Sequence, residues 1–287
     1  MRKTTHVLIA ILSMFLLSSC SSPLFDFLKE NISGDDEPIT FTETTIIDND
    51  ECSVIATKID PKGFYGYTIN VVLENKTSDK RFMFSTFNEY VNGLSIYANF
   101  SEDVGPGMIR YSQIFFLRAD LKEYKIDKIT DIEMNFNVSL YNQVGTIANE
   151  TVHLYPYGEE RVTRYERESL DTDNIIVDNE YTRVTIIDYN DHTWGFDVEM
   201  FLENKCEEEL HFNIKNSYVN DKEMTVYGSK WILPNHSAYL TFGWSRFDLI
   251  PADIHKISKI QFDLEASYQI EAFVRDYVVN ETFTLNP

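Results

Sequence analysis

The segment Ile132-Glu-Met134-Asn-Phe136-Asn-Val138-Ser-Leu140 decides the fold, because its apolar and polar residues alternate strictly. On a β-strand, a period of two places one set of side chains in a core and the other in water, whereas a helix would scatter both sets. A second segment has the same phase: Ile260-Gln-Phe262-Asp-Leu264-Glu-Ala266-Ser-Tyr268-Gln-Ile270. Both segments are predicted to be half-buried strands.

The two alternating strands belong to a longer internal repeat whose motifs return in the same order. The motif pairs are Tyr65-Gly-Tyr67 with Trp194-Gly-Phe196, Val72-Leu-Glu-Asn-Lys76 with Phe201-Leu-Glu-Asn-Lys205, Tyr90-Val-Asn92 with Tyr218-Val-Asn220, and Asn149-Glu-Thr151 with Asn280-Glu-Thr282. The offset drifts only between 128 and 131 residues, so chance is a poor explanation. The chain is therefore interpreted as two consecutive copies of one domain.

The two copies are predicted at residues 46–157 and 175–287, and a charge-dense segment at 158–174 is predicted to link them. Each copy has several short strand patterns separated by turn signals, and no long helical period occurs in the chain. About seven short strands in roughly 110 residues are typical of an immunoglobulin-like sandwich. The sequence thus predicts an all-β protein with two tandem immunoglobulin-like antiparallel β-sandwich domains. Short helical turns are expected at 117–124 and 247–255, before the alternating strands.

The N-terminus has the pattern of an export signal. Arg2 and Lys3 precede a short apolar segment, which ends in Leu17-Ser-Ser-Cys20. The apolar segment is shorter than the ~20 residues that span a bilayer, so residues 1–19 are predicted to be a lipoprotein signal peptide. Cys20 is the predicted lipidation site, and residues 20–45 are expected to form an acidic tether. An ordinary secretory signal with a coincidental cysteine is the alternative.

Together the lipobox, the acidic tether and the paired motifs resemble those of uncharacterised lipoproteins of Gram-positive bacteria that carry tandem Ig-like domains. The resemblance covers nearly the whole chain, but its motifs are strand and turn signatures. It implies a lipid-anchored protein on the extracytoplasmic face of the bacterial cell membrane, with the membrane as a partner through the lipid on Cys20. It implies no catalytic residue.

Composition excludes several classes of protein. The formal net charge of −21 argues against nucleic acid as a partner, because phosphate recognition needs a basic surface. Three cysteines in 287 residues are too few for a disulfide scaffold. Cys52 is expected to be a small buried residue and Cys206 a turn residue.

No catalytic motif is recognisable in the sequence. The zinc-protease, P-loop, dinucleotide-binding and serine-hydrolase patterns are all missing, and the histidines do not recur between the copies. The glutamates of the two Leu-Glu-Asn-Lys motifs could be ligands or acids, but a turn that both copies need explains the motif better. The protein is therefore predicted not to be an enzyme, and catalysis is kept as a minority hypothesis.

Acidic residues at the predicted domain junction suggest a calcium hypothesis. Asp171, Asp173, Asp178 and Glu180 could supply oxygen ligands from both sides of the junction. Their spacing does not fit an EF-hand, and solvated loop residues are the alternative. No other cofactor is predicted.

All three tryptophans lie in the second copy. Trp194 and Trp244 replace aromatic residues of the first copy and are predicted to be core residues. Trp231 has no aromatic counterpart and is the preferred ligand-binding candidate, with Tyr227, Lys230 and His236 as its expected neighbours. Partial burial at a sheet edge is the alternative for Trp231.

These features predict a surface binding or adhesion protein whose ligand is a cell-wall or host glycan or an envelope protein. The alternative is a structural spacer or an accessory subunit of an envelope assembly.

Overall fold

The computed structural model describes residues 38–271 and 274–287, and within them the fold is almost entirely β. The predicted signal peptide, Cys20 and most of the predicted tether lie outside the described residues. In the described part of the chain, no helix is long and apolar enough to cross a bilayer. The all-β, antiparallel sandwich character predicted from the alternating segments is confirmed.

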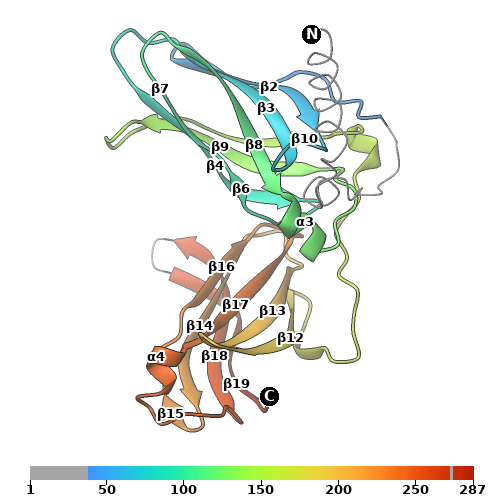
Figure 1. The fold of residues 1–287 in the computed structure, drawn as a ribbon, viewed down its shortest axis with the longest axis vertical. Coiled ribbons are helices and arrows are strands. Elements are labelled where there is room, and N and C mark those ends of the chain that lie inside the picture. Colours follow the sequence, from blue (N-terminus) through green and yellow to red (C-terminus); the bar gives the residue numbers. More distant parts are fainter. Residues whose placement is uncertain (1–37, 272–273) are drawn as a thin grey trace, which may run out of the picture. The chain divides into compact units, whose positions relative to one another are not determined.

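The strands of the predicted first repeat, together with the start of β1 just before it, pack as two antiparallel layers against each other (Figure 1). One layer runs in the order β1 (Thr44–Asp48), β2 (Cys52–Asp60), β3 (Gly66–Asn75), β8 (Ile109–Leu117) and β6 (Ala98–Asn99). The other contains β10 (Thr146–Leu154), β9 (Ile132–Leu140), β4 (Phe82–Val91), β5 (Leu94–Ser95) and β7 (Ser101–Val104). The alternating segment that predicted the fold is β9, and its apolar residues are buried between the layers.

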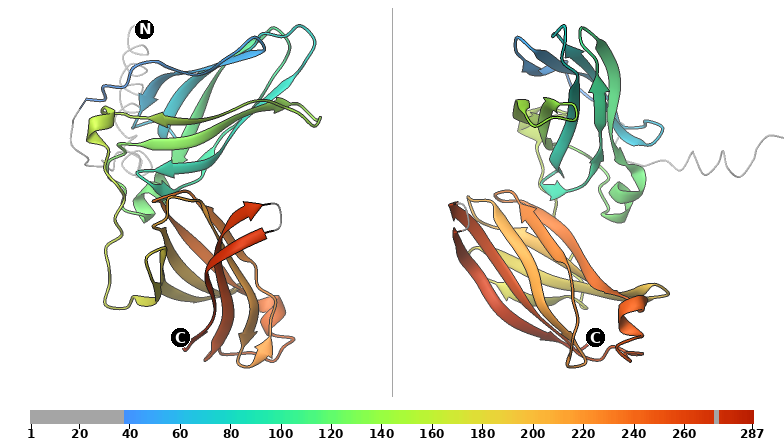
Figure 2. Two further views of the ribbon diagram at one scale, coloured as in Figure 1. Left: turned by 180° about the vertical axis from the view of Figure 1, so that it is seen from behind. Right: turned by 90° about the vertical axis from the view of Figure 1, so that its left-hand side faces the viewer.

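The strands of the predicted second repeat follow the same plan, and β11 begins one residue before its predicted start (Figure 2). One layer is β11 (Asn174–Asp178), β12 (Thr182–His192), β13 (Gly195–Asn204) and β17 (Ser237–Ser245). The other is β15 (Lys222–Glu223), β14 (Leu210–Val219), β18 (Ile260–Glu271) and β19 (Val274–Leu285), with β16 (Gly228–Ile232) also paired to β14. The short helices α3 (Arg118–Glu123) and α4 (Arg246–Leu249) lie where helical turns were predicted, and a 3-10 turn, η1 (Glu159–Arg161), follows the first repeat.

Two hydrophobic cores hold these layers together. The first is built from residues of the first repeat together with Phe201, and the second is built from residues of the second repeat. A single parallel bridge between Leu94 and Ser237 joins β5 to β17, so one layer of each repeat becomes part of a continuous nine-stranded sheet. Residues 38–287 form one compact unit, and the immunoglobulin-like type, the count of two domains and their boundaries stay predictions.

Both cysteines in the described residues are free thiols. Cys52 is buried at the start of β2, and Cys206 is half-buried in the turn after Asn204, as expected from their positions in the sequence.

Candidate functional site

The Leu-Glu-Asn-Lys motifs hold the end of a strand to its neighbouring loops, and they do not form a binding or catalytic site. We call this set of contacts, made by the asparagine and the lysine of each motif, the joint. The Asn75 side chain is buried, and its Nδ2 donates to the carbonyls of Lys80 and Val104, at 2.8 and 3.0 Å. Asn204 repeats this arrangement with carbonyls of the same loop and of the β16–β17 connection. Each asparagine thus donates both to the loop that follows its own strand and to the end of a second strand, β7 or β16, which is why both repeats need it.

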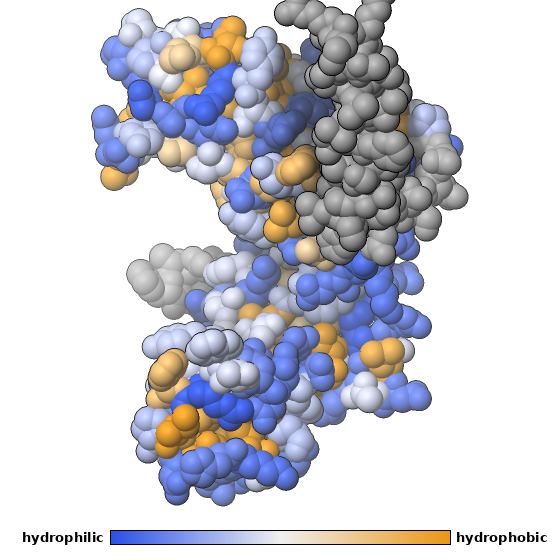
Figure 3. Space-filling model, viewed as in Figure 1, coloured by the Kyte–Doolittle hydropathy of each residue, from blue (hydrophilic) through white to orange (hydrophobic). Residues whose placement is uncertain are grey.

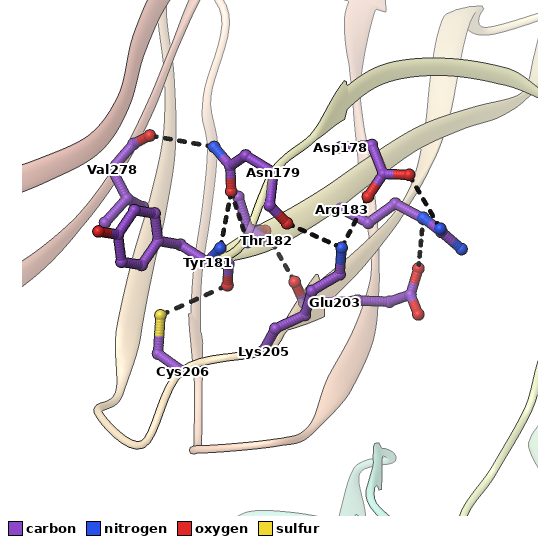
Figure 4. A network of polar contacts seen from close by, with 9 residues as sticks. All are labelled: Asp178, Asn179, Tyr181, Thr182, Arg183, Glu203, Lys205, Cys206 and Val278. Atoms are coloured by element: carbon purple, nitrogen blue, oxygen red, sulfur yellow. Dashed lines mark hydrogen bonds and ion pairs between the residues drawn. The ribbon is translucent and has the colours of Figure 1, made fainter.

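The lysine of each motif completes the joint. Lys205 Nζ donates to Asp178 Oδ1 at 2.7 Å and to the Asn179 carbonyl at 3.0 Å (Figure 4). Lys76 makes the equivalent bonds to Asp48 and Asn49 in the first repeat. In the second repeat, hydrogen bonds from Arg183 and Lys205 lower the pKa of Asp178 to about 2. The Asp178 carboxylate is therefore committed to two cations of the protein.

The other predicted calcium ligands are not brought together either. Asp173 Oδ2 accepts from Arg167 at 2.5 Å and from the backbone N–H of Leu170 at 3.0 Å. Asp171 and Glu180 are exposed. Across residues 38–271 and 274–287, no three histidine, cysteine or acidic side chains gather in a way that could hold a metal ion. The geometry gives the hypothesis of a calcium clamp from these four residues no support, because arginine and lysine side chains pair with two of the carboxylates, and the hypothesis stays a prediction.

The predicted neighbours of Trp231 separate in the structure. Trp231 is 36% exposed and packs on the ring of His211, with 4.4 Å between the ring centroids. Tyr227 is exposed, whereas burial lowers the pKa of Lys230. His236 is buried and does not join a site with Trp231, because it turns toward the first repeat.

His236 belongs to a cluster of two imidazoles and two carboxylates. Its Nε2 lies 2.8 Å from Glu133 Oε2, and its Nδ1 lies 2.6 Å from the Pro234 carbonyl. His153 Nδ1 lies 2.9 Å from Asp131 Oδ1, and His153 Nε2 lies 3.7 Å from Glu133. Every one of these ring nitrogens faces a protein acceptor, so the cluster ties the repeats together and presents no free base or nucleophile.

The aromatic-Gly-aromatic motifs place one aromatic ring of each repeat in solvent. Tyr65 is 58% exposed and Trp194 is 71% exposed, while Tyr67 and Phe196 are buried. The prediction that Trp194 is a core residue was wrong, although Trp244 is buried as predicted. Tyr65 and Trp194 lie in the turns that precede β3 and β13, so the strand alternation that buries the second aromatic residue does not extend to them.

The glycine between the aromatic residues holds each turn against the neighbouring strand. A Cβ atom at Gly66 would lie 2.0 Å from the Phe116 carbonyl oxygen, and one at Gly195 would lie 2.5 Å from the Trp244 carbonyl oxygen. Only glycine permits this approach. The exposed rings are thus carried on turns with a fixed backbone.

An arginine at the start of each short helix locks the same turn. Arg118 donates through its backbone N–H to the Tyr65 carbonyl at 3.3 Å and through Nη2 to the Gly63 carbonyl at 3.1 Å. Arg246 makes the equivalent bonds to the carbonyls of Trp194 and His192, at 2.8 and 3.3 Å. We call these two turns, with Tyr65 or Trp194 at the tip, the aromatic hairpins.

A further exposed aromatic residue lies in the turn of Tyr65 and in the helix that follows Arg246, and polar side chains lie beside Trp194. Phe64 is 81% exposed and its ring makes an edge contact with Tyr65, at 4.9 Å between centroids, and Phe247 in α4 is 78% exposed. Beside Trp194, His192 Nε2 lies 2.9 Å from Asp197 Oδ2, and Arg246 pairs with Asp191. A flat apolar ring bordered by fixed donors and acceptors can stack on the C–H face of a sugar and bind its hydroxyl groups.

Sequence reasoning missed Tyr65 and Trp194 as site candidates. The available signal was that aromatic residues recur at these positions just outside the strands. On the face drawn in Figure 3, hydrophobic residues gather in small patches bordered by hydrophilic ones. Such scattered exposure is ordinary, so recurrence in both repeats is what distinguishes the hairpin rings.

No protein-family model matches the chain, and no curated protein matches it in sequence. Two solved structures are similar over 83% of the chain, at TM-scores of 0.26 and identities of 11% and 10%. One is the exo-chitosanase CsxA of Amycolatopsis orientalis, and the other is the exo-beta-D-glucosaminidase CsxA studied with inhibitors. The matches cover only 27% and 26% of those chains. Likenesses at this level carry no argument about the site.

Proposed function

We propose that this chain is a lipid-anchored protein on the extracytoplasmic face of a bacterial membrane, where it binds a cell-wall or host glycan without catalysing a reaction. The location follows from the lipobox at Cys20 and from the resemblance of the sequence to bacterial lipoproteins. The binding role is supported by one observation above all, the exposed aromatic residues at the equivalent positions Tyr65 and Trp194.

A fold requirement would explain a buried ring at an equivalent position, but it does not explain an exposed one. Both turns are rigidly held by a glycine and an arginine, so little conformational entropy would be lost when a ligand docks on the ring. Fixed aromatic rings with adjacent polar groups favour a sugar polymer as the ligand. Two such rings on one chain would bind a repeating polymer with an avidity above that of either site alone.

The test is a binding screen with the full chain purified in detergent, against cell-wall polysaccharides and host-type glycans. We expect a saturable ligand whose affinity falls roughly 30-fold in Tyr65→Ala or Trp194→Ala, the loss of a typical interface hot spot. The double variant is expected to lose most of the avidity. Tyr111→Ala, which removes a ring that is 82% exposed but lies on a strand, is the matched control.

Trp231→Ala belongs in the same screen, since Trp231 remains an exposed candidate outside the hairpins. A ligand lost only in Trp231→Ala would move the site to β16. Folded protein that binds nothing in the panel would contradict the proposal and favour a spacer or an accessory subunit of an envelope assembly.

A further inference from the structure

A pocket of 620 Å³ lies beside the segment that links the two repeats. Its walls come from the first repeat at Asn92 and Gly93, from the linking segment at Arg164 and Tyr165, and from the second repeat at Phe201 and His236, among other residues. This volume is in the range of small-molecule sites, which often lie where two structural units meet. None of the residues of the aromatic hairpins lines it.

The lining of this pocket has a higher proportion of basic residues than the chain as a whole. The chain as a whole has 25 basic against 46 acidic residues. The pocket is lined by four basic residues, Arg164, Arg167, Arg183 and Lys205, against three acidic ones, Glu166, Asp173 and Glu203. With Asp178 included, which pairs with Arg183 and Lys205, the charges balance, so this pocket repels an anion less than the acidic protein as a whole does.

Three of these four cations already have carboxylate partners. Arg167 pairs with Asp173 at 2.5 Å, and Arg183 and Lys205 both pair with Asp178, at 2.9 and 2.7 Å. These pairings leave Arg164 as the cation to consider.

Arg164 is exposed and, within the part of the chain that the structure describes, makes no ion pair with a carboxylate. Its Nη1 instead lies 3.4 Å from His236 Nε2. The carboxylate behind that imidazole, Glu133, is taken by His236 itself at 2.8 Å. The guanidinium of Arg164 therefore keeps its capacity to bind an anion from the pocket.

The backbone fixes Arg164 at the pocket wall. On one side of it, the N–H of Thr163 donates to Thr130 Oγ1 at 3.0 Å, and on the other the N–H of Tyr165 donates to the Asn92 carbonyl at 2.7 Å. The side chain then passes over Gly93, where a Cβ atom would lie 2.8 Å from Arg164 Nη1. Glycine at this position makes room for the guanidinium, so the cation is positioned before any ligand arrives.

We propose that this pocket binds an acidic saccharide, with the guanidinium of Arg164 paired to the sugar carboxylate. The planar guanidinium matches a carboxylate through two parallel N–H···O bonds. Exposed Asn235 and Ser169 on the pocket wall offer an amide and a hydroxyl group to sugar hydroxyls, and Tyr165 adds an aromatic surface. The inference deepens the proposed glycan binding by naming the charge of a ligand, but it uses residues separate from the aromatic hairpins.

The test is calorimetric titration of the full chain in detergent with three probes: a glucuronic-acid-containing disaccharide, its neutral glucose counterpart, and glucose 6-phosphate. We expect saturable binding of the acidic disaccharide and none of the neutral one. Arg164→Gln should weaken binding roughly 10- to 100-fold, the loss of a hydrogen-bonded charge pair. Arg81→Gln is the matched control, because Arg81 is also exposed and lies away from the pocket, paired with Asp103.

A second variant distinguishes loss of the binding site from loss of the folded structure. Ser169→Trp fills the pocket from an exposed position on its wall and should abolish binding while the melting temperature stays unchanged. Full affinity in Arg164→Gln, or equal binding of the neutral disaccharide, would overturn the proposal. Tighter binding of glucose 6-phosphate would replace the carboxylate with a phosphate as the ligand group and so overturn it as stated.

Failure of this inference is distinguishable from failure of the hairpin proposal. Arg164→Gln should leave hairpin-dependent glycan binding intact, and Tyr65→Ala and Trp194→Ala should leave the calorimetric affinity for the acidic disaccharide intact. Loss of both kinds of binding in any of these three variants would contradict the separation of the two sites.

Discussion

His236 and Glu133 come from different repeats, and their side chains meet at 2.8 Å between Nε2 and Oε2. Both side chains are largely withdrawn from water, with 6% and 11% exposed. Burial is the largest single effect and acts to raise the pKa of Glu133, but the hydrogen bond from His236 and the positive charges nearby together outweigh it and lower that pKa. The contact therefore couples the second repeat to β9, the strand that organises the core of the first.

Removing one partner of this pair should be costly. His236→Ala leaves the Glu133 carboxylate buried beside an empty space, so we expect a loss of about 3–5 kcal/mol in the free energy of unfolding. Urea titration followed by circular dichroism measures it. His255→Ala is the control, because His255 is 75% exposed and its ion pair is with an exposed aspartate, Asp253, so little stability is expected from it. Equal stability of the two variants would mean that the cluster contributes nothing.

Stability should also depend on pH through His153. The hydrogen bond to Asp131 outweighs burial and raises the pKa of His153 above its ordinary 6.5, with Glu133 adding to the rise and Arg164 opposing it. The stabilisation from His153 is therefore complete below pH 6.5 and is lost as the pH rises through the folded pKa. Glu133 has a pKa below its ordinary 4.5, so its contribution is present above pH 4.5 and is lost as the pH falls further.

Together these shifts place maximum stability of the cluster between about pH 4.5 and 6.5. Melting temperatures measured from pH 4 to 9 test this expectation. In His153→Gln the decline above pH 6.5 should flatten, while the decline on the acid side should persist. An unchanged alkaline decline in that variant would assign it to other groups.

Neighbouring residues of the Leu-Glu-Asn-Lys motif should differ in their effect on stability. Asn204→Ala leaves three backbone carbonyls without their donor, and we expect a loss of roughly 2–3 kcal/mol. Lys205→Met breaks a surface ion pair and one hydrogen bond to the carbonyl of exposed Asn179, and should cost about 1 kcal/mol or less. Chemical denaturation measures the free energy of unfolding of both variants. A larger loss in Lys205→Met than in Asn204→Ala would contradict the structural account of the joint.

The glycines of the aromatic hairpins should tolerate no side chain. Gly66→Ala and Gly195→Ala place a methyl group against a strand carbonyl and should destabilise the protein by about 1–3 kcal/mol each. Gly105→Ala is the control, because a Cβ atom there would meet only the flexible Met108 side chain, at 3.1 Å. Melting temperatures of the three variants compare the sites, and tolerance at Gly66 and Gly195 would show that the turns are not held as described.

Location can be tested independently of binding. If Cys20 is lipidated, Cys20→Ser should move the protein from the membrane fraction to the soluble exported fraction, because acyl chains supply the anchoring energy. Cell fractionation after labelling with radioactive palmitate measures both the label and the location. Cys206→Ser should change neither. Membrane attachment that survives Cys20→Ser without label would contradict the lipoprotein assignment.

The alternation of apolar and polar residues along the sequence was enough to predict most of the fold, as β9 shows. Its alternation correctly predicted a strand with Met134, Phe136 and Val138 facing the core. The alternation failed at Glu133, which occupies one of its polar positions and was expected in water but is buried. The reason is that His236 and His153 cover Glu133, and a period within one strand carries no information about residues from elsewhere in the chain.

The sequence by itself determined the strands, the repeated motifs and the joints that hold each repeat together, because these depend on neighbours close in the chain or on a pattern present twice. Only the tertiary structure decided that Trp194 is exposed and that His236 pairs with Glu133 and not with Trp231. It also decided that Arg164 lines a pocket and has no carboxylate partner among residues 38–271 and 274–287. Those outcomes depend on contacts between residues tens of positions apart. Their energies come from burial and charge pairing across elements, which no local period records.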